Sequence, residues 1–126
     1  MSYQFSLAGS YLADPLSGDT SLDPSTPAPI DEQMTLDKRS VFDVKLTTDA
    51  LAAVPMGGIT SAHIVILKAI EGKVLAKLTS VAGIAQIVPV DKVLILISEG
   101  DPITAISLTR TPALLTTVRV FLGEKA

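Results

Sequence analysis

The chain has 126 residues, which suits one domain around a single core, and 48% of them are hydrophobic although only 4% are aromatic. It contains no Cys, which excludes disulfides and thiolate metal sites, so stability must come from packing or from oligomerisation. The net charge of −3 argues against a nucleic-acid-binding surface, because such a surface needs clustered Lys and Arg.

Charge is divided unevenly along the chain. Residues 1–37 hold six acidic residues and no Lys or Arg, whereas residues 38–126 hold ten basic and seven acidic residues. The first segment therefore carries a charge of −6 and the second a charge of +3. We expect an acidic N-terminal arm over residues 1–37 and a mildly basic domain over residues 38–126.

The first residues have the alternation of a β-strand. Tyr3, Phe5 and Leu7 alternate with polar residues, a period of two that places all three on one face. Residues 14–33 follow and contain four prolines among Ser, Thr and Asp, so neither a helix nor a central strand is expected there. We interpret this segment as an extended linker with a reach of about 60 Å.

An apolar strand beyond such a linker needs a partner, because an unpaired strand promotes aggregation. Two outcomes are open. The strand folds back onto its own sheet, or it pairs with a neighbouring subunit and becomes an assembly device. Tyr3, Phe5 and Leu7 are therefore candidate assembly contacts.

The remainder of the chain consists of short β-strand patterns. Residues 41–47 alternate as a half-buried strand, residues 50–56 suit a short edge strand or a helical turn, and residues 59–70 are apolar enough for a central strand. Glu71 and Gly72 then leave a two-residue gap before residues 73–80, which predicts a hairpin. Pro89 makes residues 84–90 an edge strand or a bulged one.

Three more strands complete the pattern: residues 92–98 as a second core strand, and residues 103–110 and 115–122 with period-two alternation. Seven or eight strands without a helical period predict an all-β antiparallel β-sandwich, jelly-roll-like or immunoglobulin-like, with an extended N-terminal arm. Arg110 and Arg119 are candidates for outward assembly contacts. The expected core positions include Val65, Leu67, Leu94 and Val118.

The residues available for catalysis are few. His63 is the one imidazole, and its place within an apolar strand favours a packed or edge-exposed histidine over a catalytic one. The sequence has no nucleophile elbow, phosphate-binding loop or metal-ligand cluster, and the acidic residues of the arm do not match a calcium loop. We expect a protein that is not an enzyme and that uses no cofactor and no metal.

Neither a secretory signal nor a membrane span is expected. The N-terminus lacks a positively charged region followed by an apolar run, and no apolar run approaches the roughly 18–20 residues that a bilayer requires. We therefore expect synthesis as a soluble cytosolic product with no membrane partner and no nucleic-acid partner.

Two segments resemble a known class of proteins. They are ITSAHIVILKAIEGKVLAKL at residues 59–78 and KVLILISEGDPITAISLTRTPALLTTVRVFLGE at residues 92–124. Their succession of a strand, an acidic Gly-containing turn, a Thr-rich strand and a last strand resembles small β-sandwich virion proteins of tailed bacteriophages. The resemblance implies a capsid decoration or cement protein that acts in the virion, most often as a homotrimer, by bridging major capsid subunits. It carries over no individual residue.

Two further functions fit the same pattern. A neck, tail or fibre-attachment protein of the virion would have a similar composition. A carbohydrate or host-surface binding module, or a small hydrolase built around His63, belongs to a different class. Sugar-binding surfaces use exposed aromatic rings, but this chain has no Trp, and its two Tyr residues, Tyr3 and Tyr11, both precede the linker.

Overall fold

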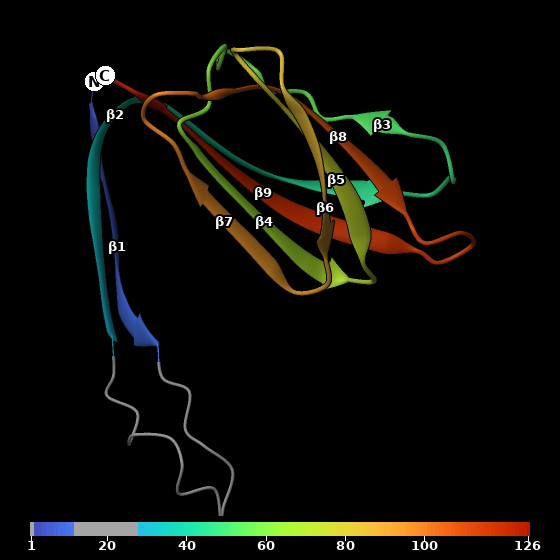
Figure 1. The fold of residues 1–126 in the computed structure, drawn as a ribbon. Helices are drawn as coiled ribbons and strands as arrows, with labels where there is room; N and C mark the ends of the chain where they lie inside the picture. Colours follow the sequence, from blue (N-terminus) through green and yellow to red (C-terminus); the bar gives the residue numbers. More distant parts are fainter. Residues whose placement is uncertain (1, 12–27) are drawn as a thin grey trace, which may run out of the picture.

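The computed structural model describes residues 2–11 and 28–126, and within them every regular element is a β-strand. Figure 1 shows the strands in chain order. They are β1 (Tyr3–Tyr11), β2 (Ala28–Leu46), β3 (Ala52–Ala53), β4 (Ile64–Glu71), β5 (Val74–Ser80), β6 (Ala85–Val90), β7 (Val93–Ile97), β8 (Ile103–Arg110) and β9 (Thr116–Lys125).

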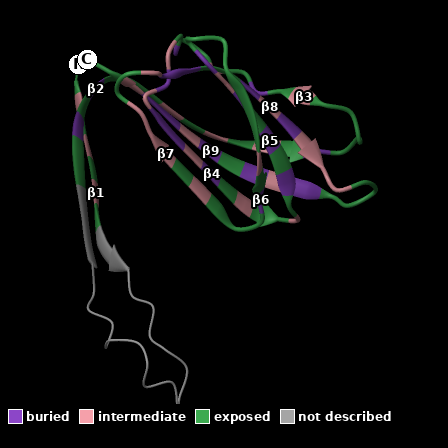
Figure 2. Cartoon of the chain, in the orientation of Figure 1, coloured by how far each residue is buried: buried purple, intermediate pink, exposed green. Residues whose placement is uncertain are grey.

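The strands form two antiparallel sheets that pack face to face, which confirms the predicted β-sandwich. One sheet has the order β1-β2-β9-β4-β7 and is called sheet A here; the other, sheet B, has the order β3-β8-β5-β6. In the strands that face the other sheet, such as β4, β5, β8 and β9, alternate residues point into the space between the sheets and are buried (Figure 2). This core includes Val65, Leu67, Val118, Val120 and Leu122 from sheet A and Val74, Ala76, Leu78, Ile106 and Leu108 from sheet B.

The aliphatic composition explains how this core forms without large rings. Val65, Leu67 and Val118 are fully buried, as the alternation predicts, whereas Leu94 is only half-buried. Full burial of one such side chain stabilises the fold by roughly 1.5–3 kcal/mol relative to leaving it exposed.

Strand β2 is the longest element and has two successive partners. Residues 28–36 pair with β1, and Leu36–Leu46 pair with β9. Strand β1 thus pairs within its own chain, and the β1/β2 hairpin extends beyond the sandwich (Figure 1). The interpretation of residues 14–33 as a linker is wrong for residues 28–33, which belong to β2; residues 14–27 lie outside the described residues. Pro29 is tolerated there because this part of β2 pairs on one side only.

A β-bulge in β2 turns the hairpin over the outer face of sheet A, the face that points away from sheet B. Leu36 pairs with Lys125 and Lys38 with Glu124, so Asp37 has no counterpart on β9. The extra residue reverses the facing of the strand and brings Leu36 onto the outer face. The expected boundary between the N-terminal arm and the domain, at residues 37 and 38, therefore coincides with the bulge and lies inside the continuous strand β2.

Gly123 makes room for this arrangement. A Cβ at Gly123 would lie 2.8 Å from Cδ1 of Leu36, so the leucine occupies the space that any other side chain would fill. Met34, Leu36 and Ile64 form a second buried cluster there. The half-buried side chains of Tyr3, Phe5, Ile66, Ile97 and Phe121 pack against it.

The hairpin expected at Glu71 and Gly72 is wrong. Strand β4 lies in sheet A and β5 in sheet B, so this turn crosses between the sheets instead of joining paired strands. Gly72 has a φ of 75°, and a Cβ there would lie 2.5 Å from Oγ1 of Thr116. The close passage over β9 is therefore possible for glycine alone.

The sheet edges agree with the sequence at two strands and differ at a third. Strands β3 and β6 lie at the edges of sheet B, as the short segment at residues 50–56 and Pro89 predict. Strand β7 is an edge strand of sheet A, so the prediction of a second core strand at residues 92–98 is wrong. Its Val93 and Ile95 are exposed, because they lie on the outer face of sheet A at its open edge.

Candidate interaction surface

His63 has a structural contact. Its Nδ1 accepts a hydrogen bond of 3.0 Å from the backbone N–H of Lys125, and its own backbone N–H donates to the carbonyl of Gly123. These bonds hold the segment before β4 against the end of β9. Among the described residues, no three side chains of His, Cys, Asp or Glu are grouped so as to hold a metal ion. Exposed apolar side chains on the outer face of sheet A are a candidate for function.

The outer face of sheet A carries a continuous apolar row across four strands. Ile95 of β7 pairs with Ile66 of β4, Ile66 pairs with Phe121 of β9, and Phe121 pairs with Val41 of β2. Paired residues in a sheet share a face, so these side chains lie side by side. Ile95 is 44% exposed and Val41 is 59% exposed. Such a row would be expected in a core, yet sheet B covers only the other face.

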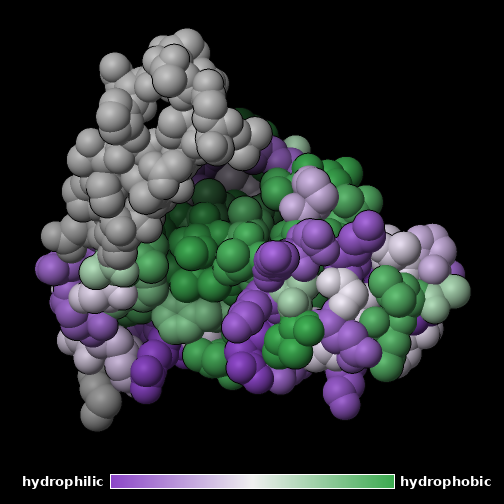
Figure 3. All heavy atoms as spheres, turned by 90° about the horizontal axis from the view of Figure 1, so that it is seen from below, coloured by the Kyte–Doolittle hydropathy of each residue, from purple (hydrophilic) through white to green (hydrophobic). Residues whose placement is uncertain are grey.

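Next to this row lies a concave surface, which we call the outer hollow. It is lined by Leu7, Glu32, Ile95, Ile97 and Glu99, and its volume is about 510 Å³. The β1/β2 hairpin forms one wall and the β7 edge the other. Figure 3, which views the molecule from below, shows hydrophobic side chains gathered in this hollow. Contiguous exposed apolar surface of this kind marks interaction sites in soluble proteins.

The three predicted contacts on β1 all point toward this surface. Phe5 packs on Phe121 with ring centroids 5.8 Å apart, and Leu7 lines the hollow. The guanidinium carbon of Arg39 lies 4.4 Å from the ring centroid of Tyr3, a cation–π contact. The structure thus brings Tyr3, Phe5 and Leu7 together on one wall; their role in assembly stays a prediction.

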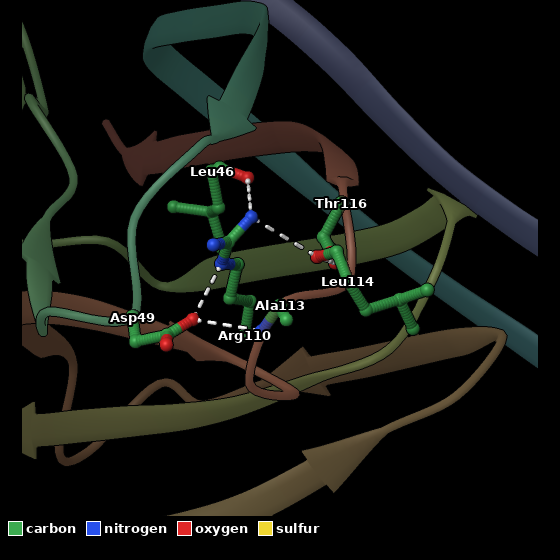
Figure 4. A network of polar contacts seen from close by, with 6 residues as sticks. All are labelled: Leu46, Asp49, Arg110, Ala113, Leu114 and Thr116. Carbon is green, nitrogen blue, oxygen red and sulfur yellow. Dashed lines mark hydrogen bonds and ion pairs between the residues drawn. The ribbon is translucent and has the colours of Figure 1, made fainter.

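Arg110 does not point outward, and that expectation is wrong. Its side chain is only 12% exposed, and its Nε donates to Oδ1 of Asp49 at 2.9 Å. Its Nη1 lies 3.4 Å from the carbonyl oxygens of Leu46 and Leu114 (Figure 4). The residue joins the end of β2 to the β8–β9 loop, which is a structural function.

Asp49 completes this network. Its Oδ1 also accepts the backbone N–H of Ala113 at 3.0 Å, where Ala113 has a φ of 62°. The Ala113 N–H, followed by the Arg110 guanidinium, lowers the pKa of the Asp49 carboxyl below its ordinary value. The carboxylate therefore supports a left-handed residue in the loop before β9.

Arg119 lies on the outer face, as expected. It is 55% exposed, and its Nε donates to Oδ1 of Asp43 at 2.9 Å. The hydrogen bond from Arg119 lowers the pKa of Asp43. The pair lies one row beyond Ile66 and Phe121, at the polar border of the apolar surface. A contact between Arg119 and a partner stays a prediction.

The sequence does not identify Ile95 and Ile97 as contact residues. They belong to the uncharged run VLILI at residues 93–97, which equally suits a buried strand and an exposed edge. Only the strand order of sheet A distinguishes the two.

No protein-family model, curated protein or solved structure matches this chain. Within residues 2–11 and 28–126, no helix has the length and apolar character to span a membrane.

Proposed function

We propose that this chain is a structural subunit of a larger protein assembly, and more specifically a virion protein of the capsid decoration or cement type. The observation that carries the proposal is the outer hollow, an exposed apolar concavity of about 510 Å³ walled by a hairpin that extends from the sandwich. The mechanism is the addition of interface area, repeated over many copies, between neighbouring subunits of a shell.

The shape supports a bridging role. The sandwich has its own buried core, and the hairpin packs against a separate cluster on the outer face. Leu7 and Ile97 are only half-buried, so a neighbouring subunit that covered them would gain hydrophobic stabilisation of about 25 cal/mol for each Å² removed from water. The virion setting rests on the resemblance of residues 59–78 and 92–124, and the major capsid protein is the partner it implies.

The sugar-binding alternative has less support. Tyr3 has Arg39 against its ring at 4.4 Å, so that ring is already engaged by a side chain. A neck or tail protein could use the same apolar surface, so only its location in the virion distinguishes this alternative from a cement protein.

The test is co-sedimentation of the purified chain with expanded empty capsids of the phage that encodes it. We expect the wild-type chain to bind, and Leu7→Asp or Ile97→Asp to weaken binding at least tenfold, about 1.4 kcal/mol. Ile87→Asp is the matched control, because Ile87 is 66% exposed on β6, away from the hollow, and it should bind as the wild type does.

Absence of wild-type binding to capsids would refute the cement proposal, and binding to isolated necks or tails instead would establish the alternative location. Equal binding by all three variants would show that the outer hollow is not the contact surface.

A further inference from the structure

The outward edge of β7 presents unpaired backbone groups. The backbone carbonyl of Lys92 accepts a hydrogen bond from the backbone N–H of Ala69, and the backbone N–H of Ser98 donates to the carbonyl of His63. The N–H and C=O groups of the even-numbered residues of β7 therefore point toward β4. In an antiparallel ladder the alternate residues face the other way. The N–H and C=O groups of Val93, Ile95 and Ile97 therefore point away from sheet A, and among the described residues no strand pairs with them.

This edge also lacks the usual protection against strand pairing. Edge strands of monomeric proteins commonly carry a Lys or a Pro that blocks a further strand. Strand β6 has such a device in Pro89. The backbone N–H of Ser80 donates to the carbonyl of Ile84, so the backbone groups of the even-numbered residues of β6 point toward β5. Pro89 therefore lies at an outward-facing position, where it offers no N–H to a further strand. In β7, Val93–Ile97 contains neither a charge nor a proline.

We propose that β7 is a homotypic pairing edge, on which β7 of a second copy of this chain pairs antiparallel about a two-fold axis at Ile95. In this register Ile95 pairs with Ile95 of the second copy, and Val93 pairs with Ile97. All three residues lie in hydrogen-bonded positions, so each exchanges its N–H and C=O with the opposite strand. Sheet A continues from one copy into the other.

The side chains and charges suit a second copy as the occupant. Val93 and Ile95 are 55% and 44% exposed, and their pairing residues are apolar in this register. The turn before β7 holds Asp91 and Lys92, and the opposite end holds Glu99, which pairs with Lys125 at 3.5 Å. This register places Asp91 opposite Glu99 of the second copy, and Lys92 and Lys125 supply one positive charge for each of the two carboxylates at that end.

The two-fold contact goes beyond the proposed function and does not depend on it. An isologous contact of this kind produces a dimer. The homotrimer that the phage resemblance implies would need a different contact. Leu7→Asp on β1 changes the outer hollow but not the β7 edge, so it tests capsid binding separately from the two-fold contact.

The test is the mass of the full-length chain in solution, measured by sedimentation equilibrium over a range of concentrations. We expect a monomer–dimer equilibrium, and an increase of at least about tenfold in the dissociation constant for Ile95→Pro. Proline at this position removes only an outward-facing N–H, so pairing with β4 and the melting temperature should be largely kept. Ile95→Lys places a charge at the same position and should weaken the dimer in the same way, so it replaces the proline variant if that variant does not fold.

A cross-link tests the register. The chain has no Cys, so Ile95→Cys introduces a single thiol. Cα atoms of a hydrogen-bonded antiparallel pair are about 5.5 Å apart, within the range of a disulfide. Mild oxidation should give a covalent dimer with Ile95→Cys and little dimer with Ile87→Cys, the matched control on β6.

The proposal fails if the wild-type chain is a monomer at every concentration. It also fails if Ile95→Pro or Ile95→Lys, once folded, associates as the wild type does, or if the two cysteine variants cross-link equally. Association that survives these changes would indicate another contact, such as exchange of the β1/β2 hairpin.

Discussion

At the scale of single residues, Arg110 shows how a side chain acquires its function from distant parts of the chain. Along β8 it lies on the same face of the strand as the buried Ile106 and Leu108, and Asp49, 61 residues away, meets its guanidinium at 2.9 Å. Arg119 has a similar ion pair with Asp43 yet stays exposed on the outer face. Removal of Arg110 would therefore leave buried hydrogen-bonding groups without a partner, whereas removal of Arg119 would leave groups that water can reach.

We predict that Arg110→Ala lowers the free energy of unfolding by about 1.5 kcal/mol or more, because the charged group bonds a carboxylate and two backbone carbonyls. Urea unfolding monitored by circular dichroism measures the loss. Arg119→Ala is the control and should cost less, since its ion pair is exposed to water. Equal losses in the two variants would contradict the structural function of Arg110.

Asp49 predicts how stability depends on pH. Its folded-state pKa lies below the ordinary value, so its carboxylate stabilises the folded chain above the ordinary pKa, and this contribution is lost as pH falls through the folded pKa. Asp49→Asn should therefore be less stable than the wild type at neutral pH, and the difference should shrink below about pH 5. Unfolding free energies measured at several pH values provide the comparison; a difference that stays constant with pH would argue against the carboxylate.

At the scale of elements, the β1/β2 hairpin depends on one bulge and one glycine. Asp37 reverses the facing of β2, and Gly123 leaves the space that Leu36 fills on the outer face. Neither feature has a clear signal in the sequence. A glycine in a strand suggests a bulge or a close approach, and here the close approach comes from a side chain 87 positions earlier.

We predict that Gly123→Ala destabilises the chain by about 1–3 kcal/mol, because its Cβ would lie 2.8 Å from Cδ1 of Leu36 in a packed cluster. Leu36→Ala should relieve that clash, so the double variant should lose less than the sum of the two single changes. A double-mutant cycle of unfolding free energies measures this coupling. Additive losses would mean that Leu36 does not occupy the space above Gly123.

At the scale of the whole molecule, the sandwich and the hairpin have separate hydrophobic clusters. The sandwich core begins at Leu46 in the sequence, whereas the outer cluster joins Met34 and Leu36 to Ile64. We predict that a chain lacking residues 1–37 still unfolds cooperatively, at lower stability, because the sandwich core keeps all of its buried members. Thermal unfolding followed by circular dichroism tests this, and a chain without a cooperative transition would show that the hairpin is needed for folding.

Leu67→Ala in the full-length chain is the matched comparison. Leu67 is fully buried between the sheets, so we predict a loss of roughly 2–5 kcal/mol in the free energy of unfolding. This loss should exceed that of Leu94→Ala, because Leu94 is only half-buried on the edge strand β7. Denaturant titration of the two variants measures the difference, and a larger loss at Leu94 would contradict the assignment of β7 as an edge.

The sequence alone determined the all-β class, most of the strands and the buried set Val65, Leu67 and Val118, because the period of two along a strand is a local property. It also placed Tyr3, Phe5 and Leu7 on one face. Only the tertiary structure decided that β4 and β5 belong to different sheets, that β7 is an edge and that Arg110 is engaged within the fold. Those outcomes depend on which strands pair across long sequence separations, and an apolar run such as Val93–Ile97 is the same whether a partner covers it or not.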